Sequence, residues 1–290
     1  MESALDCVPC LLRQALEATR MATDDPTIQD SVMRALLLLL AEMDPGETPP
    51  RMAQRVHHYV RDSTGTADPY RESKTYQNRV ASTMLPRLRN LLATAPDPLD
   101  VALRLAIAGN VIDLGLQTHL AESDIQITLD KALHEPLSGD PHLFKRLTED
   151  AETILYLADN AGEIVFDRLL VEQLGPEKTT VVVRGAPVLN DATLADARTT
   201  GLIDIVRVIG NGSDAPGTVL ADCSDEFRTL FSRADLVIAK GQGNYESLSD
   251  EQRPVYFLFR VKCPVIASHV GLPMGTNALV HSEFRPSEAD

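Results

Sequence analysis

The second half of the chain contains a series of short apolar runs, each followed by turn-forming residues. The runs are rich in β-branched side chains, which is typical of strands buried on both faces. They occupy residues 153–157, 179–183, 205–209, 236–238, 255–259 and 265–267. Helix-compatible stretches such as 164–174 and 194–200 separate most of them. Strands joined by helical crossovers form parallel sheets, so we predict a doubly wound α/β domain over residues 151–290.

The first 150 residues have a different pattern. Apolar residues recur at helical spacing, and clusters of turn residues interrupt them at residues 24–26, 44–46, 95–98 and 138–141. We therefore predict a mostly helical N-terminal part of six or seven helices. A chain of 290 residues exceeds the usual size of one domain, which agrees with two unequal parts.

The charge balance restricts the partners of this protein. The chain has 27 basic and 42 acidic residues, a net charge of -15, and no basic stripe. Nucleic acid is therefore not an expected partner. A phosphate ligand would need a local cation, for which a bound metal is a ready source. The longest apolar run has seven residues, whereas a membrane-spanning helix needs about 20, so we expect a cytoplasmic protein without a membrane partner.

Polar side chains directly follow two of the predicted strands. Asp159 and Asn160 come after the run at 153–157, and Asp191 lies in the loop after the run at 179–183. Ligands of open parallel sheets bind at the carboxyl ends of strands, where these loops meet. Two carboxylates and an amide oxygen suit Mg²⁺ or Mn²⁺ and leave room for water and phosphate. We predict a catalytic metal site here, with Lys240 neutralising a transferred phosphoryl group.

The same residues also have a purely structural interpretation. Asn160 and Glu163 fit a helix-capping pattern, and Asp191 fits a cap of the next helix. The two glycines between Lys240 and Asn244 could approach an anion or form an ordinary turn. The position of both acidic loops at one edge of the sheet favours the site.

The cysteines are expected to be reduced, because four thiols in a cytoplasmic chain of this size do not make a disulfide framework. Cys7 and Cys10 have the spacing of half a zinc site, but no second pair follows at finger-like distance. One interpretation is a buried pair of small apolar residues. The other is a three-thiol cluster with Cys263, if the first helix docks beside it.

The loop motifs resemble those of the damage-control phosphatase family, formerly known only as a domain of unknown function. In the second half they are Asp159-Asn-Ala-Gly-Glu163, Pro187-Val-Leu-Asn-Asp-Ala-Thr193, Lys240-Gly-Gln-Gly-Asn-Tyr-Glu246 and Lys262-Cys-Pro264. In the first half they are Cys7-Val-Pro-Cys10, Asp68-Pro-Tyr70 with Lys74, and Ala108-Gly-Asn-Val-Ile-Asp113. The likeness covers nearly the whole chain, which is similar to the cysteine-bearing prokaryotic subgroup.

The resemblance implies a helical part joined to a Rossmann-like, three-layer α/β/α part. It implies hydrolysis of small phosphate esters that are damaged or unwanted metabolites, among them damaged nucleotides or related phosphometabolites. The cofactor would be Mn²⁺, Mg²⁺, Ni²⁺ or Co²⁺, and the partner a small phosphorylated metabolite.

By motif position, the resemblance assigns individual roles. The metal ligands would be Asp159, Asn160 and Asp191, and the substrate contacts Lys240, Asn244, Lys262 and Asn190, with Glu163 and Asn190 supporting the metal loops. The catalytic residues would be Asp159, Asp191 and Lys240. Either water or the Asp159 carboxylate would attack phosphorus, and the sequence leaves both nucleophiles open.

Two other functions remain open on the sequence. A carboxyl methyltransferase that uses S-adenosylmethionine would bind its nucleoside cofactor at glycine-rich strand ends, without metal. A non-catalytic metal- or ligand-binding protein would hold zinc with Cys7, Cys10 and Cys263 and turn over no phosphate ester.

Overall fold

The computed structural model describes residues 1–109, 131 and 133–282. Its centre is a seven-stranded sheet in the order β1-β7-β6-β5-β2-β3-β4. The strands are β1 (Leu137–Ser138), β2 (Ile154–Leu157), β3 (Thr179–Val183), β4 (Arg207–Gly210), β5 (Leu236–Lys240), β6 (Tyr256–Arg260) and β7 (Asn277–His281). All neighbouring pairs are parallel except β6 and β7. The predicted α/β fold with a mainly parallel sheet is confirmed.

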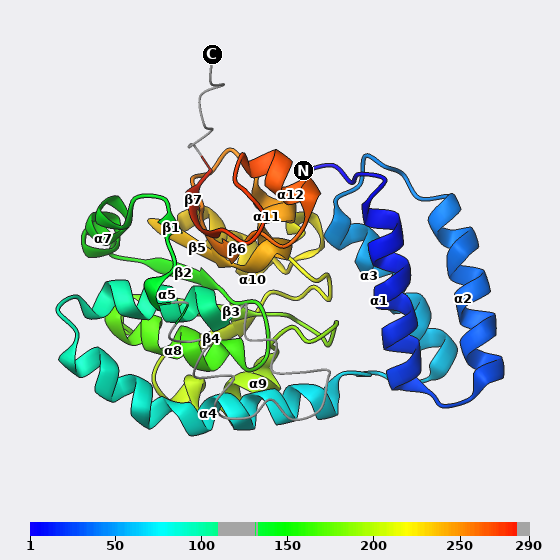
Figure 1. Ribbon diagram of the computed structural model, residues 1–290, viewed down its shortest axis with the longest axis horizontal. Coiled ribbons are helices and arrows are strands. Elements are labelled where there is room, and N and C mark those ends of the chain that lie inside the picture. Colours follow the sequence, from blue (N-terminus) through cyan, green and yellow to red (C-terminus); the bar gives the residue numbers. More distant parts are fainter. Residues whose placement is uncertain (110–130, 132, 283–290) are drawn as a thin grey trace, which may run out of the picture.

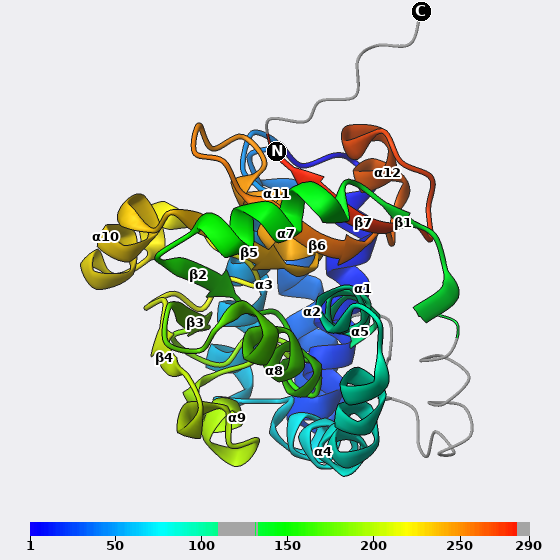
Figure 2. The same cartoon turned by 90° about the vertical axis from the view of Figure 1, so that its left-hand side faces the viewer.

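Helices cover both faces of this sheet (Figures 1 and 2). The described helices are α1 (Cys7–Ala22), α2 (Pro26–Ala41), α3 (Pro49–Thr64), α4 (Arg71–Thr94), α5 (Pro98–Gly109), α7 (Pro141–Asp150), α8 (Glu163–Leu174), α9 (Leu194–Thr199), α10 (Asp225–Arg233), α11 (Gly241–Leu248) and α12 (Pro264–Val270). Apolar residues of α4, α5, α7 and α8 share a core with one face of the sheet. Residues of α10, α11 and α12 share a core with the other face, which gives three layers.

A third core holds α1, α2 and α3 together, beside the sheet and its covering helices (Figure 1). The division of the chain at residue 150 stays a prediction. The packing groups α4, α5 and α7 with the sheet and α1 to α3 with each other.

The strand order fixes where a ligand can bind. From β2 the chain proceeds to β3 and β4 on one side, and then crosses back to β5 and β6 on the other. In open α/β sheets, the crevice outside the carboxyl ends of the strands at such a reversal is the usual binding site. Here the reversal lies between β2, which Asp159 follows, and β5, which ends at Lys240.

One of the six predicted strands is wrong. Residues 265–267 belong to α12, where Pro264 occupies the first turn and the Cys263 sulfur accepts a hydrogen bond from the Ile266 amide. This helix start outweighs the β propensity of the valine and isoleucine. The last strand is instead β7, which the sequence interpretation missed. The predicted motif from Asn110 to Asp113 lies outside the described residues.

Within the described ranges, no helix is both long enough and apolar enough to span a membrane.

The three-helix unit is tied to the loop after β4 through Asp214. This carboxylate accepts hydrogen bonds from Gln54 at 2.6 Å and from the Arg61 guanidinium, and it pairs with His58 at 2.6 Å. Burial alone would raise the pKa of Asp214, but these partners bring it below its ordinary value. Arg61 also donates to the Pro187 carbonyl at 2.7 Å, so α3 holds two loops at the carboxyl edge of the sheet.

His57 on α3 gives the helical unit a specific acid sensitivity. Its side chain is buried, and its Nε2 atom has no hydrogen-bond partner among the described residues. Burial first, and the charge of Arg61 second, lower the pKa of His57 from 6.5 to about 4. Between these pH values the unfolded chain binds a proton that the folded chain does not, so stability falls as the pH falls.

The variant His57→Leu should lose this acid-dependent component, which amounts to up to about 3 kcal/mol. Urea unfolding at pH 7 and at pH 4.5 measures it as the difference between two free energies of unfolding. The control His142→Gln changes an exposed histidine on α7 and should keep the wild-type pH dependence. An equal pH dependence in His57→Leu and wild type would contradict the assignment.

Candidate active site

Two neighbouring loops bring the predicted metal ligands together. Asn160 and Asp191 form an isolated antiparallel bridge. The Ala161 amide donates to the Asn190 carbonyl, and the Ala192 amide donates to the Asp159 carbonyl, both at 2.8 Å. The backbone therefore fixes the loop after β2 against the loop after β3. Asp159, Asn160 and Asp191 lie on one side of this connection and line the same cavity.

The second loop contains a residue in a rarely adopted backbone conformation. Leu189 has a φ of 46°, the one positive φ among the described residues other than glycine. Such conformations persist only where the surrounding structure enforces them, and they are common in functional loops. Leu189 packs against the core of the three-helix unit, and its neighbours Asn190 and Asp191 face the cavity.

The carboxylates of the site are buried and close to one another. Burial, followed by the charges of Glu163 and Asp191, raises the pKa of Asp159 well above its ordinary value. Burial also raises the pKa of Asp191, although its ion pair with Arg184 opposes the shift. Arg184 Nε lies 2.6 Å from Asp191 Oδ2, whereas Arg184 Nη2 lies 3.9 Å from Asp159 Oδ1. One arginine thus faces two aspartates, and a cation near Asp159 would relieve the remaining repulsion.

The hydrogen bonds of Asn160 fix the orientation of its amide. Its Nδ2 donates to Asp159 Oδ2 at 2.8 Å and to Glu163 Oε2 at 3.0 Å. Both acceptors are carboxylates, so the nitrogen must face them and the Oδ1 atom faces away from them. Asn160 also lines the cavity, which leaves its amide oxygen available as a hard ligand.

These groups fit a divalent cation of the Mg²⁺ or Mn²⁺ type. Two carboxylates and one amide oxygen leave several coordination positions for water and a substrate oxygen. Among residues 1–109, 131 and 133–282, no set of three or more His, Cys, Asp or Glu side chains is placed to hold a metal ion. A metal here would therefore depend on Asn160 and on non-protein ligands as well as on the aspartates.

Lys240 lies beneath the site and is fully buried. Its Nζ donates to Glu163 Oε1 and Asp167 Oδ1, each at 2.6 Å, and to the Ala106 carbonyl at 2.7 Å. Although burial opposes protonation, the two carboxylates raise the pKa of Lys240 above its ordinary value, so it is a permanent cation. All three of its protons have acceptors within the protein, on the side of the sheet covered by α5 and α8.

Asn244 is also buried, at the start of the helix that follows β5. Its Nδ2 donates to the Lys240 carbonyl at 2.7 Å, and its Oδ1 accepts from Thr218 Oγ1 at 2.7 Å. The Asn244 side chain therefore connects the end of β5 with Thr218, which lies in the loop after β4. Neither Asn244 nor Lys240 is among the described residues that line the cavity, in contrast to Lys262 and Asn190.

The cavity has a volume of about 490 Å³ and lies between α1, the start of α3 and the carboxyl edge of the sheet. Its lining includes most of the site residues predicted from the sequence, and several residues that the sequence did not indicate. Its polar and thiol lining comprises Asp6, Cys7, Cys10, Arg13, Gln14, Asp159, Asn160, Asn190, Asp191, Gln242, Glu246, Lys262 and Cys263.

Sequence reasoning missed the roles of Arg184, Arg13, Gln14, Gln242 and Glu246. Arg184 directly follows β3, so the strand-end argument could have identified it. Gln242 and Glu246 lie within a family-like motif but were given no role. Arg13 and Gln14 lie on a helix in the other half of the chain, and the possible thiol cluster with Cys263 is a sequence signal that this helix reaches the site but gives neither side chain a role.

The three predicted thiols also meet at this cavity. Cys10 Sγ lies 3.8 Å from both Arg13 Nη2 and Gln14 Nε2, and Cys263 Sγ accepts from Gln242 Nε2 at 3.6 Å. Burial raises the pKa of Cys7, so this thiol is protonated at neutral pH. The first helix lies beside Cys263, which was the condition for the thiol cluster, whereas a metal bound by Cys7, Cys10 and Cys263 stays a prediction.

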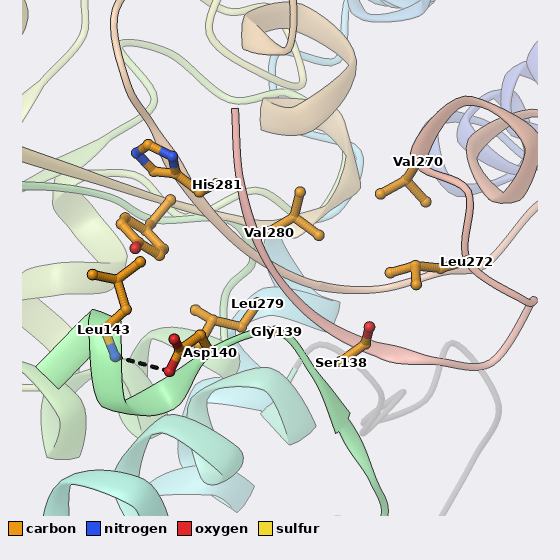
Figure 3. Close-up of a pocket in the computed structure, with 10 residues that line it drawn as sticks. Ser138, Gly139, Asp140, Leu143, Val270, Leu272, Leu279, Val280 and His281 are labelled. Atoms are coloured by element: carbon orange, nitrogen blue, oxygen red, sulfur yellow. Dashed lines mark hydrogen bonds between the residues drawn. The ribbon is translucent and has the colours of Figure 1, made fainter. Parts of the chain in front are cut away.

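A second cavity of about 300 Å³ lies beside β1 and β7, at one edge of the sheet (Figure 3). Its walls are mainly apolar, with Leu143, Val270, Leu272 and Leu279 among them. Its carboxylate, Asp140, accepts a hydrogen bond from the Leu143 amide at 2.9 Å and so caps α7. This cavity lacks the converging polar groups of the first one, which we take as the candidate active site.

Comparisons with known proteins identify similar chains. A family model described as the damage-control phosphatase ARMT1-like domain matches residues 3–278. A damage-control phosphatase of Archaeoglobus fulgidus is 35% identical over 276 residues, which cover 93% of this chain and 95% of the relative. An uncharacterized protein of Methanocaldococcus jannaschii is 35% identical over 292 residues, which cover 95% of this chain and 94% of the relative.

A solved structure is similar over almost its entire length. It is the crystal structure of a DUF89 family protein from Pyrococcus horikoshii, with a TM-score of 0.90 and 29% identity. The match covers 97% of this chain and 99% of that chain.

Gly241 provides a test of the site geometry. A Cβ atom at this position would overlap Asp159 Oδ2, and the φ of 78° disfavours other residues. We expect Gly241→Ala to displace the Asp159 carboxylate and lower phosphomonoester turnover roughly a hundredfold. Gly65→Ala is the matched control, because Gly65 has a φ of 69° and open space around its Cα. Both variants should lose about 1 kcal/mol of stability from backbone strain, but only the first should lose turnover. Equal turnover in the two variants would contradict a role for the Asp159 position.

Proposed function

Since the chain belongs to the damage-control phosphatase family, we propose that it hydrolyses small phosphate monoesters with a divalent cation held by Asp159, Asn160 and Asp191. The observation that carries this proposal is the cluster of buried, mutually repelling carboxylates beside an outward amide oxygen. Such a cluster is costly unless a cation neutralises it. Family membership favours this function over the methyltransferase and the non-catalytic protein.

A bound Mn²⁺, Mg²⁺, Ni²⁺ or Co²⁺ ion would supply charge neutralisation at the phosphoryl oxygens. Side chains of the cavity would bind the substrate. Lys262 is exposed, lines the cavity, and is close enough to Asp159 to lower the pKa of that carboxyl in part. It is therefore placed to bind the substrate phosphate as a point charge. Asn190 on the opposite loop lines the same space and can hydrogen-bond to the ester.

The reaction breaks the ester P–O bond and forms a new P–O bond to the nucleophile, and the leaving oxygen takes up a proton. Either water or the Asp159 carboxylate is the nucleophile in this proposal. An acyl-phosphate trapped on Asp159 would identify the carboxylate and exclude direct attack by water.

We assign Lys240 a positioning role instead of a contact with phosphate. Its ammonium group fixes Glu163, and Glu163 in turn holds the Asn160 amide nitrogen. This chain of contacts keeps the Asn160 oxygen directed at the metal site. Asn244 acts similarly, because it connects the backbone of Lys240 with Thr218.

The physiological role proposed here is the removal of damaged or unwanted phosphorylated metabolites in the cytoplasm. This role follows from the family, and from relatives in Archaeoglobus fulgidus and Pyrococcus horikoshii that are named damage-control phosphatases. The acidic balance of the chain supports a small metabolite over nucleic acid as the partner.

The first test is phosphate release from a panel of monoesters by metal-stripped protein, with Mg²⁺, Mn²⁺, Co²⁺ or Ni²⁺ added back. We expect turnover that requires metal and falls at least about a thousandfold in Asp159→Asn and Asp191→Asn, because several kcal/mol of charge stabilisation is lost. Asp150→Asn removes the same charge at an exposed position on α7 and should behave as wild type. Turnover that persists in Asp159→Asn would overturn the proposed site.

Two lysine variants separate positioning from substrate contact. Lys240→Met leaves Glu163 and Asp167 buried without their cation, so it should lower the free energy of unfolding by about 3–5 kcal/mol. Lys262→Met removes an exposed charge, so it should leave the unfolding midpoint nearly unchanged and lower kcat/KM roughly tenfold or more. Urea unfolding and steady-state kinetics measure the two effects. A fully stable Lys240→Met protein that fails only to bind phosphate would instead indicate direct contact.

A further inference from the structure

The wall of the active-site cavity formed by α1 has a cation without a counter-charge. Arg13 lines the cavity, and its guanidinium lies 3.8 Å from Cys10 Sγ. No carboxylate among the described residues forms an ion pair with it. Arg13 is exposed, so water solvates its guanidinium where no ligand is bound. An unpaired guanidinium in a concave site is suited to bind an anionic group of a ligand.

The neighbouring residue has an unused acceptor. Gln14 donates its Nε2 hydrogen to Cys10 Sγ, while its Oε1 is buried and accepts no hydrogen bond from the described part of the chain. Buried polar atoms normally have a partner, since an unmet one costs free energy. Gln14 lines the same cavity, so a donor from a bound molecule could fill this position.

The opposite wall differs, because its polar groups satisfy each other. Gln242 Nε2 donates to Glu246 Oε1 at 2.9 Å, and Gln242 Oε1 accepts from the Lys262 amide at 3.3 Å. Outside the loops after β2 and β3 and Lys262, α1 thus supplies both a cation without an ion pair, Arg13, and a buried acceptor without a donor, Gln14 Oε1.

We infer that Arg13 and Gln14 form a binding subsite for the organic part of the substrate, and that this part carries a second anionic group and a hydrogen-bond donor. The inference rests on the proposed function, in which the phosphate of the substrate occupies the other end of the cavity at Asp159. A cavity of about 490 Å³ has room for both ends of such a molecule. The substrate class is therefore a phosphate monoester with a carboxylate or a second phosphate at its far end.

Matched substrates test this directly. Phosphoserine differs from phosphoethanolamine by one added carboxylate, and phosphogluconate carries a carboxylate where sorbitol phosphate has a hydroxymethyl group, across a longer molecule. Sorbitol bisphosphate against sorbitol phosphate tests a second phosphate in place of the carboxylate. For at least one pair, wild type should prefer the doubly anionic member by roughly tenfold in kcat/KM, mainly through KM.

The preference should fall to near one in Arg13→Gln and be largely kept in Arg13→Lys, which retains the charge. Arg20→Gln on the same helix removes a charge in the last turn of α1 and should keep the wild-type preference. The reverse results, an unchanged preference in Arg13→Gln or no preference in wild type for any pair, would overturn the subsite.

Ligand-induced shifts of the thermal unfolding midpoint distinguish this inference from the proposed function. They are measured with the same substrate pairs and the metal-stripped wild-type and Arg13→Gln proteins, in which no turnover is needed. A shift that favours the doubly anionic member and depends on Arg13 would support the subsite even if no ester were hydrolysed. Hydrolysis of both members at equal kcat/KM, with equal shifts, would reject the subsite and leave the proposed function standing.

Discussion

The balance of buried charge around Asp159 governs the structure of this site. Four buried carboxylates, those of Asp159, Glu163, Asp167 and Asp191, contact two buried cations, Arg184 and Lys240. If all six groups are ionised, they carry two more negative than positive charges; Lys262 and Lys74 offset this excess in part, and a divalent cation would neutralise the rest. Without such an ion, protonation is the alternative, and the raised pKa values of Asp159 and Asp191 express this.

The two buried cations, Arg184 and Lys240, pair with different carboxylates. Arg184 follows β3 and faces the aspartates that reach the cavity, whereas Lys240 ends β5 and faces the acidic residues of α8. Asn160 connects these two groups of charges, because its amide nitrogen donates to Asp159, which faces Arg184, and to Glu163, which pairs with Lys240. The orientation of the Asn160 amide is therefore a consequence of the whole charge network.

Much of this arrangement was predictable from the sequence, because strand ends are local features. Asp159 and Asp191 follow apolar runs, and parallel strands bring such ends together whatever the helices do. The direction of the Lys240 side chain was not predictable in this way. The apolar run stops at Ile238, but β5 continues to Lys240, and pairing with β6 decides where the strand ends. The helix that begins at Pro264 was missed for a different reason. Its N-cap is a cysteine, which is not a usual capping residue.

The other wall of the cavity depends on contacts between distant parts of the chain, which a single sequence does not reveal. Asp214 binds α3 to the sheet edge, and α1 lines the same cavity as the loops after β2 and β3. The phosphate end and the organic end of a substrate would thus be recognised by two units with separate cores. Substitutions on α1 can then change which ester is selected without disturbing the buried charge balance that performs the reaction.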